Sequence, residues 1–577
     1  MRRKPSLIFA GLTLGALALA GCTSTTGTTA SGETATDAQV TSDMSSDYAE
    51  LAYSDLGIDE ADAVDASAAT DIALSGSEDV TISEAGTYRL SGTLKDASVV
   101  VDVAEGQVNL ILDGVSITAD ETAAINVVNA DSVVISLADG TTNALSDSAT
   151  AAVSEEEDAP NAVLFSTADL YIEGSGSLTV SATINDGITS KDSLIISGGS
   201  ITVDSVDDGV RGKDHIVVLD GVLTINAGGD GIKADNDEVL TDASSTKGVA
   251  WFTGGTVAIT AGDDGVSAER QVTVDGGSVS VSAVDDGIHT EGVLSISDGS
   301  VNVTQSNEGL EGAVVLLSGG TGSVVASDDG INVAGGYLEE TTTTSAEGGT
   351  DAQTDSQTDT RAQGGGPGGG EPPSGDMGGE RPAGGGARPS DGADRQMQGG
   401  GMGGDASVTD PSSLTVSSGS GGGMGAMPGE SNDGSGRYLL ISGGTWNVDA
   451  QGDGLDANGT MSITGGTTTV QGPSTNGNGP TDADSYSVTG GTLLAVGSSG
   501  MLVTPGEGSQ GNVVAVFSGG VAAGSEVTLT DASGTVVASV TTERVSQALI
   551  FSSPDIESGA SYTVSVAGVE VGEVTAA

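Results

Sequence analysis

The stretch Asn185-Asp186-Gly187-Ile188 introduces a short signature, in which an acidic residue precedes a glycine and an aliphatic residue. The signature returns six times, at Asp207–Val210, Gly229–Ile232, Asp263–Val266, Asp285–Ile288, Asn307–Leu310 and Asp328–Ile331. Its glycines lie 22 residues apart, except for one step of 34 and one of 21. A fixed period of this length is typical of a solenoid, in which each repeat buries its apolar face only against its neighbours.

Each period contains runs of strand type, as in Ser193–Val203, where two alternating β-branched runs meet at a Gly-Gly corner. A shorter third run follows the acidic signature, and no helical period is present. The sequence therefore predicts an all-β fold, a right-handed parallel β-helix with three short strands in each coil of about 22 residues. Glycine is expected at the corners that require a positive φ.

Stacking should bring the acidic residues of successive signatures into one column at one edge, with coils about 4.8 Å apart. The expected column is Asp186, Asp208, Asp230, Asp264, Asp286, Glu308 and Asp329. Carboxylates at this spacing repel one another by about 1 kcal/mol even in water, so the column must be solvated or neutralised. Oxygen ligands at this density suit calcium, which accepts irregular carboxylate geometry. Alternatively, Asp-Gly is only favourable turn chemistry, with the Asp side chain bonding its own backbone.

The candidate metal ligands include both residues of each Asp-Asp doublet and four further aspartates. They are Asp186, Asp207, Asp208, Asp230, Asp235, Asp263, Asp264, Asp285, Asp286, Asp328, Asp329 and Asp453. Four basic residues follow the signature glycines by two or four positions, which places them beside the column: Lys191, Arg211, Lys213 and Lys233. They are interpreted either as ion pairs that offset the acids or as a strip that contacts an anionic sugar.

The chain resembles bacterial cell-surface carbohydrate-binding proteins that have a calcium-binding, pectate-lyase-like parallel β-helix, described first in cellulose-degrading clostridia. The matching residues are Tyr88–Leu94, Asp158–Ala162, Gly174–Leu178, Gly229–Asp235 and Asn476–Gly479. The resemblance implies binding to plant cell-wall polysaccharides such as cellulose and polygalacturonate, with calcium in the turns of the helix. One departure is Glu308, which replaces Asp in the sixth signature.

Residues 1–22 are predicted to be a lipoprotein signal peptide. Arg2, Arg3 and Lys4 precede an apolar run, and Leu19-Ala20-Gly21-Cys22 is similar to a bacterial lipobox. Cys22 is the single cysteine of the chain, so it is the predicted lipidation site and no disulfide supports the fold. Anchoring by lipid alone would place the protein on the extracellular face of the cell membrane.

Changes in composition divide the rest of the chain into three predicted segments. Residues 23–70 are rich in Ser, Thr, Ala and Asp and are predicted to be a flexible tether. Residues 71–510 are the predicted β-helix, interrupted at 337–437 by a Gly- and Pro-rich insertion predicted to be disordered. Residues 511–577 contain paired runs around short turns and are predicted to form a small antiparallel β cap.

The net charge of −64, from 17 basic and 81 acidic residues, excludes nucleic acid as a partner, because such binding needs Lys and Arg on phosphates. The leading interpretation is a monomeric polysaccharide-binding protein with calcium as cofactor. A calcium-dependent lyase is the enzymatic alternative, with Arg211, Arg270, Lys213 or Lys233 as the base. A structural adhesin is the third. His215 and His289 are interpreted as turn or surface residues and not as bases.

Overall fold

The computed structural model describes residues 48–120, 123–148, 159–336, 408–419 and 436–577. Its described residues form β-strands and four short 3-10 helices, so the predicted all-β class is confirmed. The 3-10 helices are η1 (Tyr53–Asp55), η2 (Ala66–Ala68), η3 (Asp237–Leu240) and η4 (Pro411–Ser413). In this part of the chain no helix is both long and apolar enough to cross a membrane.

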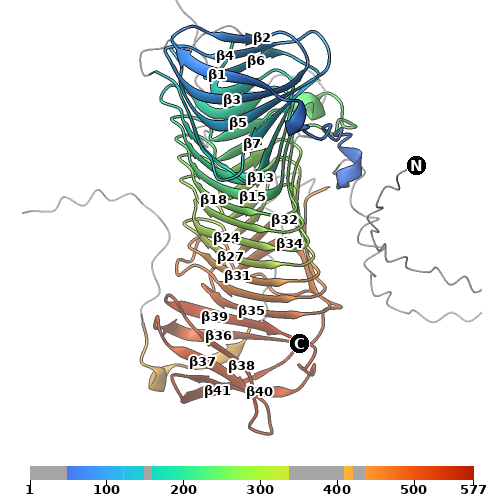
Figure 1. The fold of residues 1–577 in the computed structure, drawn as a ribbon. Helices are drawn as coiled ribbons and strands as arrows, with labels where there is room; N and C mark the ends of the chain where they lie inside the picture. The colour runs from blue at the N-terminus through green and yellow to red at the C-terminus, as the bar shows by residue number, and fades with distance from the viewer. Residues whose placement is uncertain (1–47, 121–122, 149–158, 337–407, 420–435) are drawn as a thin grey trace, which may run out of the picture. The chain divides into compact units, whose positions relative to one another are not determined.

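Most strands pair in parallel with the strand one sequence period later, in three ladders that belong to a single sheet. Figure 1 shows these strands stacked in chain order from β2 and β4 towards β35. The first ladder contains β1 (Thr70–Gly76), β3 (Gly86–Lys95), β5 (Gln107–Thr118), β7 (Ser132–Leu137), β10 (Asp169–Gly174), β13 (Ser193–Asp204), β15 (His215–Asn226), β17 (Val249–Phe252), β20 (Gln271–Val274), β23 (Val293–Ile296), β26 (Val314–Leu317) and β30 (Tyr438–Ile441).

The second ladder passes through the later halves of β5, β13 and β15. It also contains β8 (Thr142–Ser146), β11 (Ser177–Ser181), β18 (Thr256–Thr260), β21 (Ser278–Ser282), β24 (Ser300–Gln305), β27 (Thr321–Ala326), β31 (Thr445–Ala450), β33 (Thr467–Gln471) and β35 (Thr492–Gly497).

The third ladder includes the short strands at the acidic signatures, from β12 to β28, and continues on both sides of them. It contains β2 (Val80–Ile82), β4 (Val99–Asp102), β6 (Ile125–Asn129), β9 (Ala162–Ser166), β12 (Asp186–Ser190), β14 (Val210–Gly212), β16 (Ile232–Ala234), β19 (Val266–Ala268), β22 (Ile288–Thr290), β25 (Leu310–Glu311), β28 (Ile331–Val333), β32 (Leu455–Ile463) and β34 (Thr481–Val488). Ile188 pairs with Val210 and Val210 with Ile232, so one step along this ladder equals the sequence period.

Alternating residues of each strand point into one continuous core. Strand β11 shows the period of two, because Leu178 and Val180 are buried between more exposed neighbours. Leu178 pairs in register with Ile201 of β13, and Ile201 with Leu223 of β15. Each coil therefore covers the aliphatic side chains of the coil before it, which is how a repeat too small to hold its own core becomes stable.

The predicted insertion interrupts the chain but not the stack. Strand β26 pairs with β30, with Val314 opposite Tyr438, although more than a hundred residues separate them. Residues 337–407 and 420–435 lie outside the described residues. Residues 408–419, within the predicted disordered segment, are ordered instead: β29 (Val416–Ser418) pairs with β36, and Leu414 is 4% exposed.

The C-terminal residues form an antiparallel cap, as expected from their paired runs. Strand β39 pairs antiparallel with both β35 and β36, and four further strands form a separate antiparallel sheet. The strands are β36 (Asn512–Val521), β37 (Glu526–Thr530), β38 (Val536–Thr541), β39 (Ser546–Ser552), β40 (Ser561–Val566) and β41 (Val569–Thr575).

Residues 48–69, within the predicted flexible tether, pack along the outside of the first ladder instead. Leu56 is 4% exposed and belongs to an apolar cluster with Tyr171 and Trp251. The Tyr53 ring meets the Trp251 ring edge-on, with centroids 5.7 Å apart. The Tyr171 hydroxyl donates to the carbonyl of Asp59 at 2.7 Å. The sparse apolar residues of this segment therefore have partners on the sheet.

Candidate metal site along the acidic column

The acidic column lies on the turn before the third ladder, and backbone hydrogen bonds hold it in register. We use this name for Asp186, Asp208, Asp230, Asp264, Asp286, Glu308, Asp329 and Asp453. The N–H of each of Asp230, Asp264 and Asp286 donates at 3.0 Å to Oδ1 of the aspartate one coil earlier. The N–H of Glu308 continues the series, at 3.3 Å from Asp286 Oδ1. One oxygen of these aspartates thus has a structural task, but its partner is the backbone of the next coil, whereas the turn-chemistry alternative expects a bond within the same turn.

The signature glycine has a steric role that differs from the predicted one. At Gly209 a Cβ atom would lie 2.4 Å from Cγ2 of Ile225 and 2.5 Å from the carbonyl oxygen of Gly231. The positive φ angles occur instead at the other corners, for example 91° at Gly199 and 76° at Gly277. Glycine therefore follows the acidic residue because the next coil approaches too closely for any side chain.

The second carboxylate oxygen meets a partner column in the coils from Asp186 to Glu308, and this column consists of the side chains three residues later in the chain. The partner column is Thr189, Arg211, Lys233, Ser267, His289, Glu311, Asn332 and Asp456. Strand pairing places Thr189 beside Arg211, Arg211 beside Lys233, and Asn332 beside Asp456. The two columns together form a strip of polar side chains, and its charge changes along the stack.

In the earlier coils, basic residues neutralise the acids. The ammonium of Lys233 lies 2.7 Å from Asp230 Oδ2 and 3.4 Å from Asp208 Oδ2. Arg211 Nε donates to Asp235 Oδ1 at 3.0 Å, and Arg211 Nη1 lies 4.0 Å from Asp186 Oδ2. These contacts favour the ion-pair interpretation of Arg211 and Lys233. Burial lowers the pKa of Lys233, but the carboxylates of Asp208 and Asp230 outweigh it, so the net pKa is raised.

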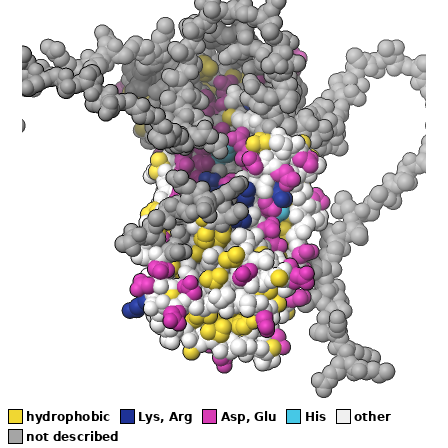
Figure 2. Space-filling view, turned by 90° about the horizontal axis from the view of Figure 1, so that it is seen from above, with side chains coloured by type: hydrophobic (Ala, Val, Ile, Leu, Met, Phe, Trp, Pro, Cys, Tyr) yellow, Lys and Arg dark blue, Asp and Glu magenta, His cyan; other side chains and the backbone are white. Residues whose placement is uncertain are grey.

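The remaining predicted residues lie around the column. Lys191 and Lys213 are half-buried, directly after β12 and β14. The first residues of the doublets are exposed: Asp207, Asp263, Asp285 and Asp328. On the face drawn in Figure 2, Asp and Glu side chains surround the few Lys and Arg side chains.

His289 occupies the centre of the strip, so its interpretation as a turn or surface residue is wrong. Its Nδ1 lies 3.2 Å from Asp286 Oδ2 and 3.4 Å from Glu311 Oε2, and its Nε2 lies 3.6 Å from Glu291 Oε1. Burial alone would lower the pKa of His289, but hydrogen bonds to Asp286 and Glu291 outweigh it and raise the pKa well above its ordinary value. His289 follows Asp286 by three residues, as Lys233 follows Asp230, so the period could have revealed it.

His215 is also buried, at 5% exposure, and the structure gives it a supporting role. Its Nδ1 lies 3.0 Å from Ser193 Oγ, and its Nε2 lies 2.8 Å from the carbonyl oxygen of Thr246. Arg270, the remaining arginine of the lyase alternative, is 4% exposed and donates to the carbonyl of Ala243 at 3.1 Å. Neither side chain belongs to the two columns.

In the later coils the strip is acidic and has no Lys or Arg neighbour among the described residues, although Glu311 still contacts His289. Among the residues that the structure describes, neither Glu308 nor Asp456 forms an ion pair with Lys or Arg. Burial, and then neighbouring carboxylates, raises the pKa of Glu308 to about 7 and that of Asp456 to about 8. Burial and a hydrogen bond to Asp286 raise the pKa of Glu311 to about 9. Ionising these groups together is therefore costly unless a cation accompanies them.

Three groups in the described part of the chain could hold a metal ion, because their ligand atoms lie within 4.8 Å of one another. They are Asp230–Asp263–Asp264, Asp264–Asp286–His289 and Asp286–Glu308–Glu311. Asn332 adjoins the last group: its Nδ2 donates to Glu308, while its buried Oδ1 accepts no hydrogen bond from a described residue. Glu308, Glu311 and Asn332 were not among the predicted ligands, because the search followed aspartates and not the two columns.

Comparison with known proteins agrees with the resemblance seen in the sequence. A family model of carbohydrate-binding domain-containing proteins matches residues 76–352. A carbohydrate-binding domain-containing protein of Acetivibrio thermocellus is 46% identical over 199 residues, which are 34% of this chain and 68% of that protein. The chain belongs to this family. The solved polysaccharide lyase-like protein from C. thermocellum, a gadolinium derivative, is 38% identical, with a TM-score of 0.36 over 38% of this chain and 87% of that one.

Proposed function

We propose that the protein binds polysaccharide through calcium ions held in the acidic strip, which the acidic column and the partner column form together. We also propose that the stacked coils are the predicted right-handed parallel β-helix. Family membership supports carbohydrate as the ligand class. The family resemblance suggests polygalacturonate or cellulose. Calcium would bridge protein carboxylates to sugar carboxylates or hydroxyls. This route suits a chain in which aromatic residues make up only 3%, too few for an extensive stacking platform.

The observation that carries the proposal is the group Asp286–Glu308–Glu311. Its three carboxylates provide ligand oxygens within 4.8 Å of one another, and the Asn332 carbonyl beside them has no donor among the described residues. Carboxylate and amide oxygens are the ligands that calcium prefers in proteins. A bound divalent cation would relieve the repulsion between these carboxylates and give the Asn332 oxygen a partner.

The experiment that tests the metal site is a calcium titration by calorimetry on the full chain. Glu311→Gln should weaken calcium binding at least tenfold, because it removes a charged ligand from the group. The matched control is Asp298→Asn, which also removes one negative charge but lies on an outer turn, bonded to the N–H of Gly299. Equal affinities for the wild type and Glu311→Gln would overturn the assignment of calcium to this group.

Retention on insoluble polygalacturonate and on cellulose, with calcium or with a chelator, tests the ligand. The wild type should be retained with calcium, and chelation or Glu311→Gln should reduce retention on polygalacturonate. An assay for unsaturated products in the same samples addresses the lyase alternative. No product is expected, because Arg211 is engaged in ion pairs and Arg270 is buried away from the strip.

We also propose that Cys22, which lies outside the described residues, carries the lipid anchor and holds the protein at the extracellular face of the membrane. The sequence pattern Leu19–Cys22 supports this assignment. Cys22→Ser should leave the protein in the aqueous phase of a detergent partition. Persistence of that variant in the detergent phase would contradict lipid anchoring.

A further inference from the structure

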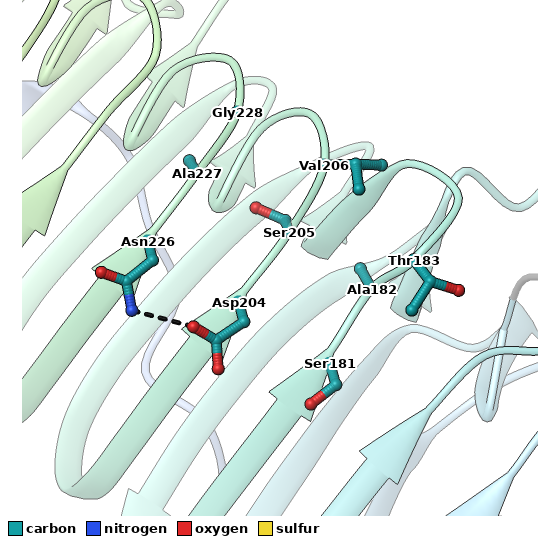
Figure 3. Close-up of a pocket in the computed structure, with 9 residues that line it drawn as sticks. All are labelled: Ser181, Ala182, Thr183, Asp204, Ser205, Val206, Asn226, Ala227 and Gly228. Carbon is teal, nitrogen blue, oxygen red and sulfur yellow. Dashed lines mark hydrogen bonds between the residues drawn. The ribbon is translucent and has the colours of Figure 1, made fainter. Parts of the chain in front are cut away.

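A shallow groove crosses three coils at the corner between the second ladder and the acidic turns. Its volume is about 440 Å³, and the ends of β11, β13 and β15 contribute to it. Figure 3 shows Ser181, Asp204 and Asn226 side by side at these strand ends, with Ser205 and Val206 on the turn beyond. This volume falls within the range of about 300–1,000 Å³ typical of small-molecule sites.

The groove offers several hydrogen-bond acceptors. Asn226 Nδ2 donates to Asp204 Oδ1 at 2.8 Å, which fixes the two exposed side chains relative to each other. The side-chain oxygens Asp204 Oδ2 and Asn226 Oδ1 form no hydrogen bond with another described residue, so both can accept one from a ligand. A fixed carboxylate–amide pair of this kind matches two neighbouring hydroxyl groups, each of which donates one hydrogen bond.

The groove also has an apolar side. Val206 is 55% exposed, so its aliphatic side chain is open to a ligand. Gly228 lines the groove next to Val206 and has no side chain that would fill it. A Cβ at this position would lie 2.3 Å from the carbonyl oxygen of Val206, so a larger residue does not fit. A pyranose ring combines a rim of hydroxyl groups with C–H faces, so its rim can meet Asp204 and Asn226 while a face contacts Val206.

The charge around the groove excludes anionic ligands. No Lys or Arg is among its lining residues, and its one charged lining group is the Asp204 carboxylate. Asp207 is exposed on the adjoining turn and adds a second negative charge. A uronate would therefore be repelled here, whereas at the acidic strip a calcium ion would compensate for the repulsion.

We infer that this groove is a binding subsite for one or two neutral, hydroxyl-rich sugar rings of a polysaccharide, and that it works without calcium. The inference rests on the proposed carbohydrate-binding function and adds a second location to it. Two steps between coils span about 10 Å, which is enough for a disaccharide unit along the stack. With few contacts and no aromatic ring, the subsite is weak by itself and contributes by multivalency along a polymer.

The test uses a matched pair of variants of the full chain. Val206→Glu places bulk and charge in the groove. Val284→Glu makes the same change at the equivalent turn position three coils later, where Val284 is 67% exposed and does not line this groove. Both sites face solvent, so both variants should keep the wild-type melting temperature.

Binding of cellohexaose, mannohexaose and hexagalacturonate is measured by saturation-transfer NMR in the presence of a chelator. We expect at least one neutral hexasaccharide to bind, with affinity reduced at least fivefold by Val206→Glu and unchanged by Val284→Glu. Equal effects of the two variants, or no neutral binding without calcium, would overturn the subsite. If the subsite is overturned in this way, calcium-dependent retention on polygalacturonate would still support the proposed function. If the wild type binds no sugar with or without calcium, both the subsite and the proposed function are wrong.

Discussion

The backbone N–H of Asp264 donates to Oδ1 of Asp230 at 3.0 Å, although 34 residues separate them in the chain. The same carboxylate uses Oδ2 to meet the ammonium of Lys233 at 2.7 Å. One oxygen therefore fixes the register between coils, and the other is available for a cation. A structural role and cation binding are not exclusive interpretations of the signature, because each explains a different oxygen of the same residue.

The raised pKa values of the acidic strip predict how stability depends on pH. Burial, and after it neighbouring charges, raises the pKa of Asp264 and Asp453 to about 7 and that of Asp456 to about 8. Between about pH 4 and pH 8 the folded chain then holds protons that the unfolded chain has lost, so stability falls as pH rises.

Urea unfolding in a chelator should give a lower midpoint at pH 8 than at pH 5. Millimolar calcium should reduce this difference, since the ion replaces the protons at the carboxylates. A midpoint that rises from pH 5 to pH 8 in the chelator would contradict the electrostatic account of the strip.

Lys233→Met should lower the free energy of unfolding by about 1–3 kcal/mol, because it leaves two mostly buried carboxylates without their cation. Lys95→Met is the control, since Lys95 is exposed at the end of β3. Adding Asp208→Asn to Lys233→Met should recover part of the loss, because one unpaired charge disappears. If the loss in free energy of unfolding of the double variant equals the sum of the losses of the two single variants, the pairing of Lys233 with Asp208 contributes nothing.

The repetitive part of the fold could be predicted because its period is visible in the chain. Once the period is known, strand pairing and the alignment of Asp208 with Asp230 follow from the geometry of stacking. Contacts outside the repeat follow no period. Leu56 and Leu414 are single apolar residues in polar surroundings, and their burial depends on surfaces that exist only after the coils have stacked.

The candidate site was predicted in outline but not in detail. The column of acids was expected, whereas Glu311 and His289 carry no local motif and become neighbours only through the second column. A search at three residues after each acid would have found both. The exposure of the first residue of each doublet, such as Asp207, depends on how the turn is oriented, which the spacing does not determine.

Deleting 408–419 should destabilise the C-terminal cap, although these residues lie within the insertion predicted to be disordered. The deletion removes β29, in which Val416 pairs with Phe517, and the buried Leu414, for a loss of at least about 2 kcal/mol. The control deletes residues 339–405 only, and it should unfold like the wild type because loop-closure cost changes slowly with length. Identical urea midpoints for the two deletions would contradict a structural role for β29.

Strands β27 and β31 lie on either side of the insertion, and substitutions in the core can test the register in which they pair. Gly322 of β27 pairs with Trp446 of β31, and a Cβ at Gly322 would lie 2.1 Å from Cε3 of the fully buried indole ring. In the coils directly before Gly322 the core residues of this row are aliphatic, as at Val279 and Val301, and Val301 pairs with Gly322. A small residue in one coil thus makes room for a large one in the next.

Gly322→Val should therefore destabilise the protein by at least about 2 kcal/mol through overpacking. Adding Trp446→Val should restore most of that stability, because the row then returns to aliphatic residues of similar size in successive coils. Ser323→Val, on the neighbouring exposed position, controls for strand propensity and should be close to neutral. Urea unfolding of the wild type, the two single variants Gly322→Val and Trp446→Val, their double variant and the Ser323→Val control measures the coupling. If Trp446→Val fails to rescue Gly322→Val, the two residues are not neighbours, and the coil after the insertion does not stack in the register that places β31 on β27.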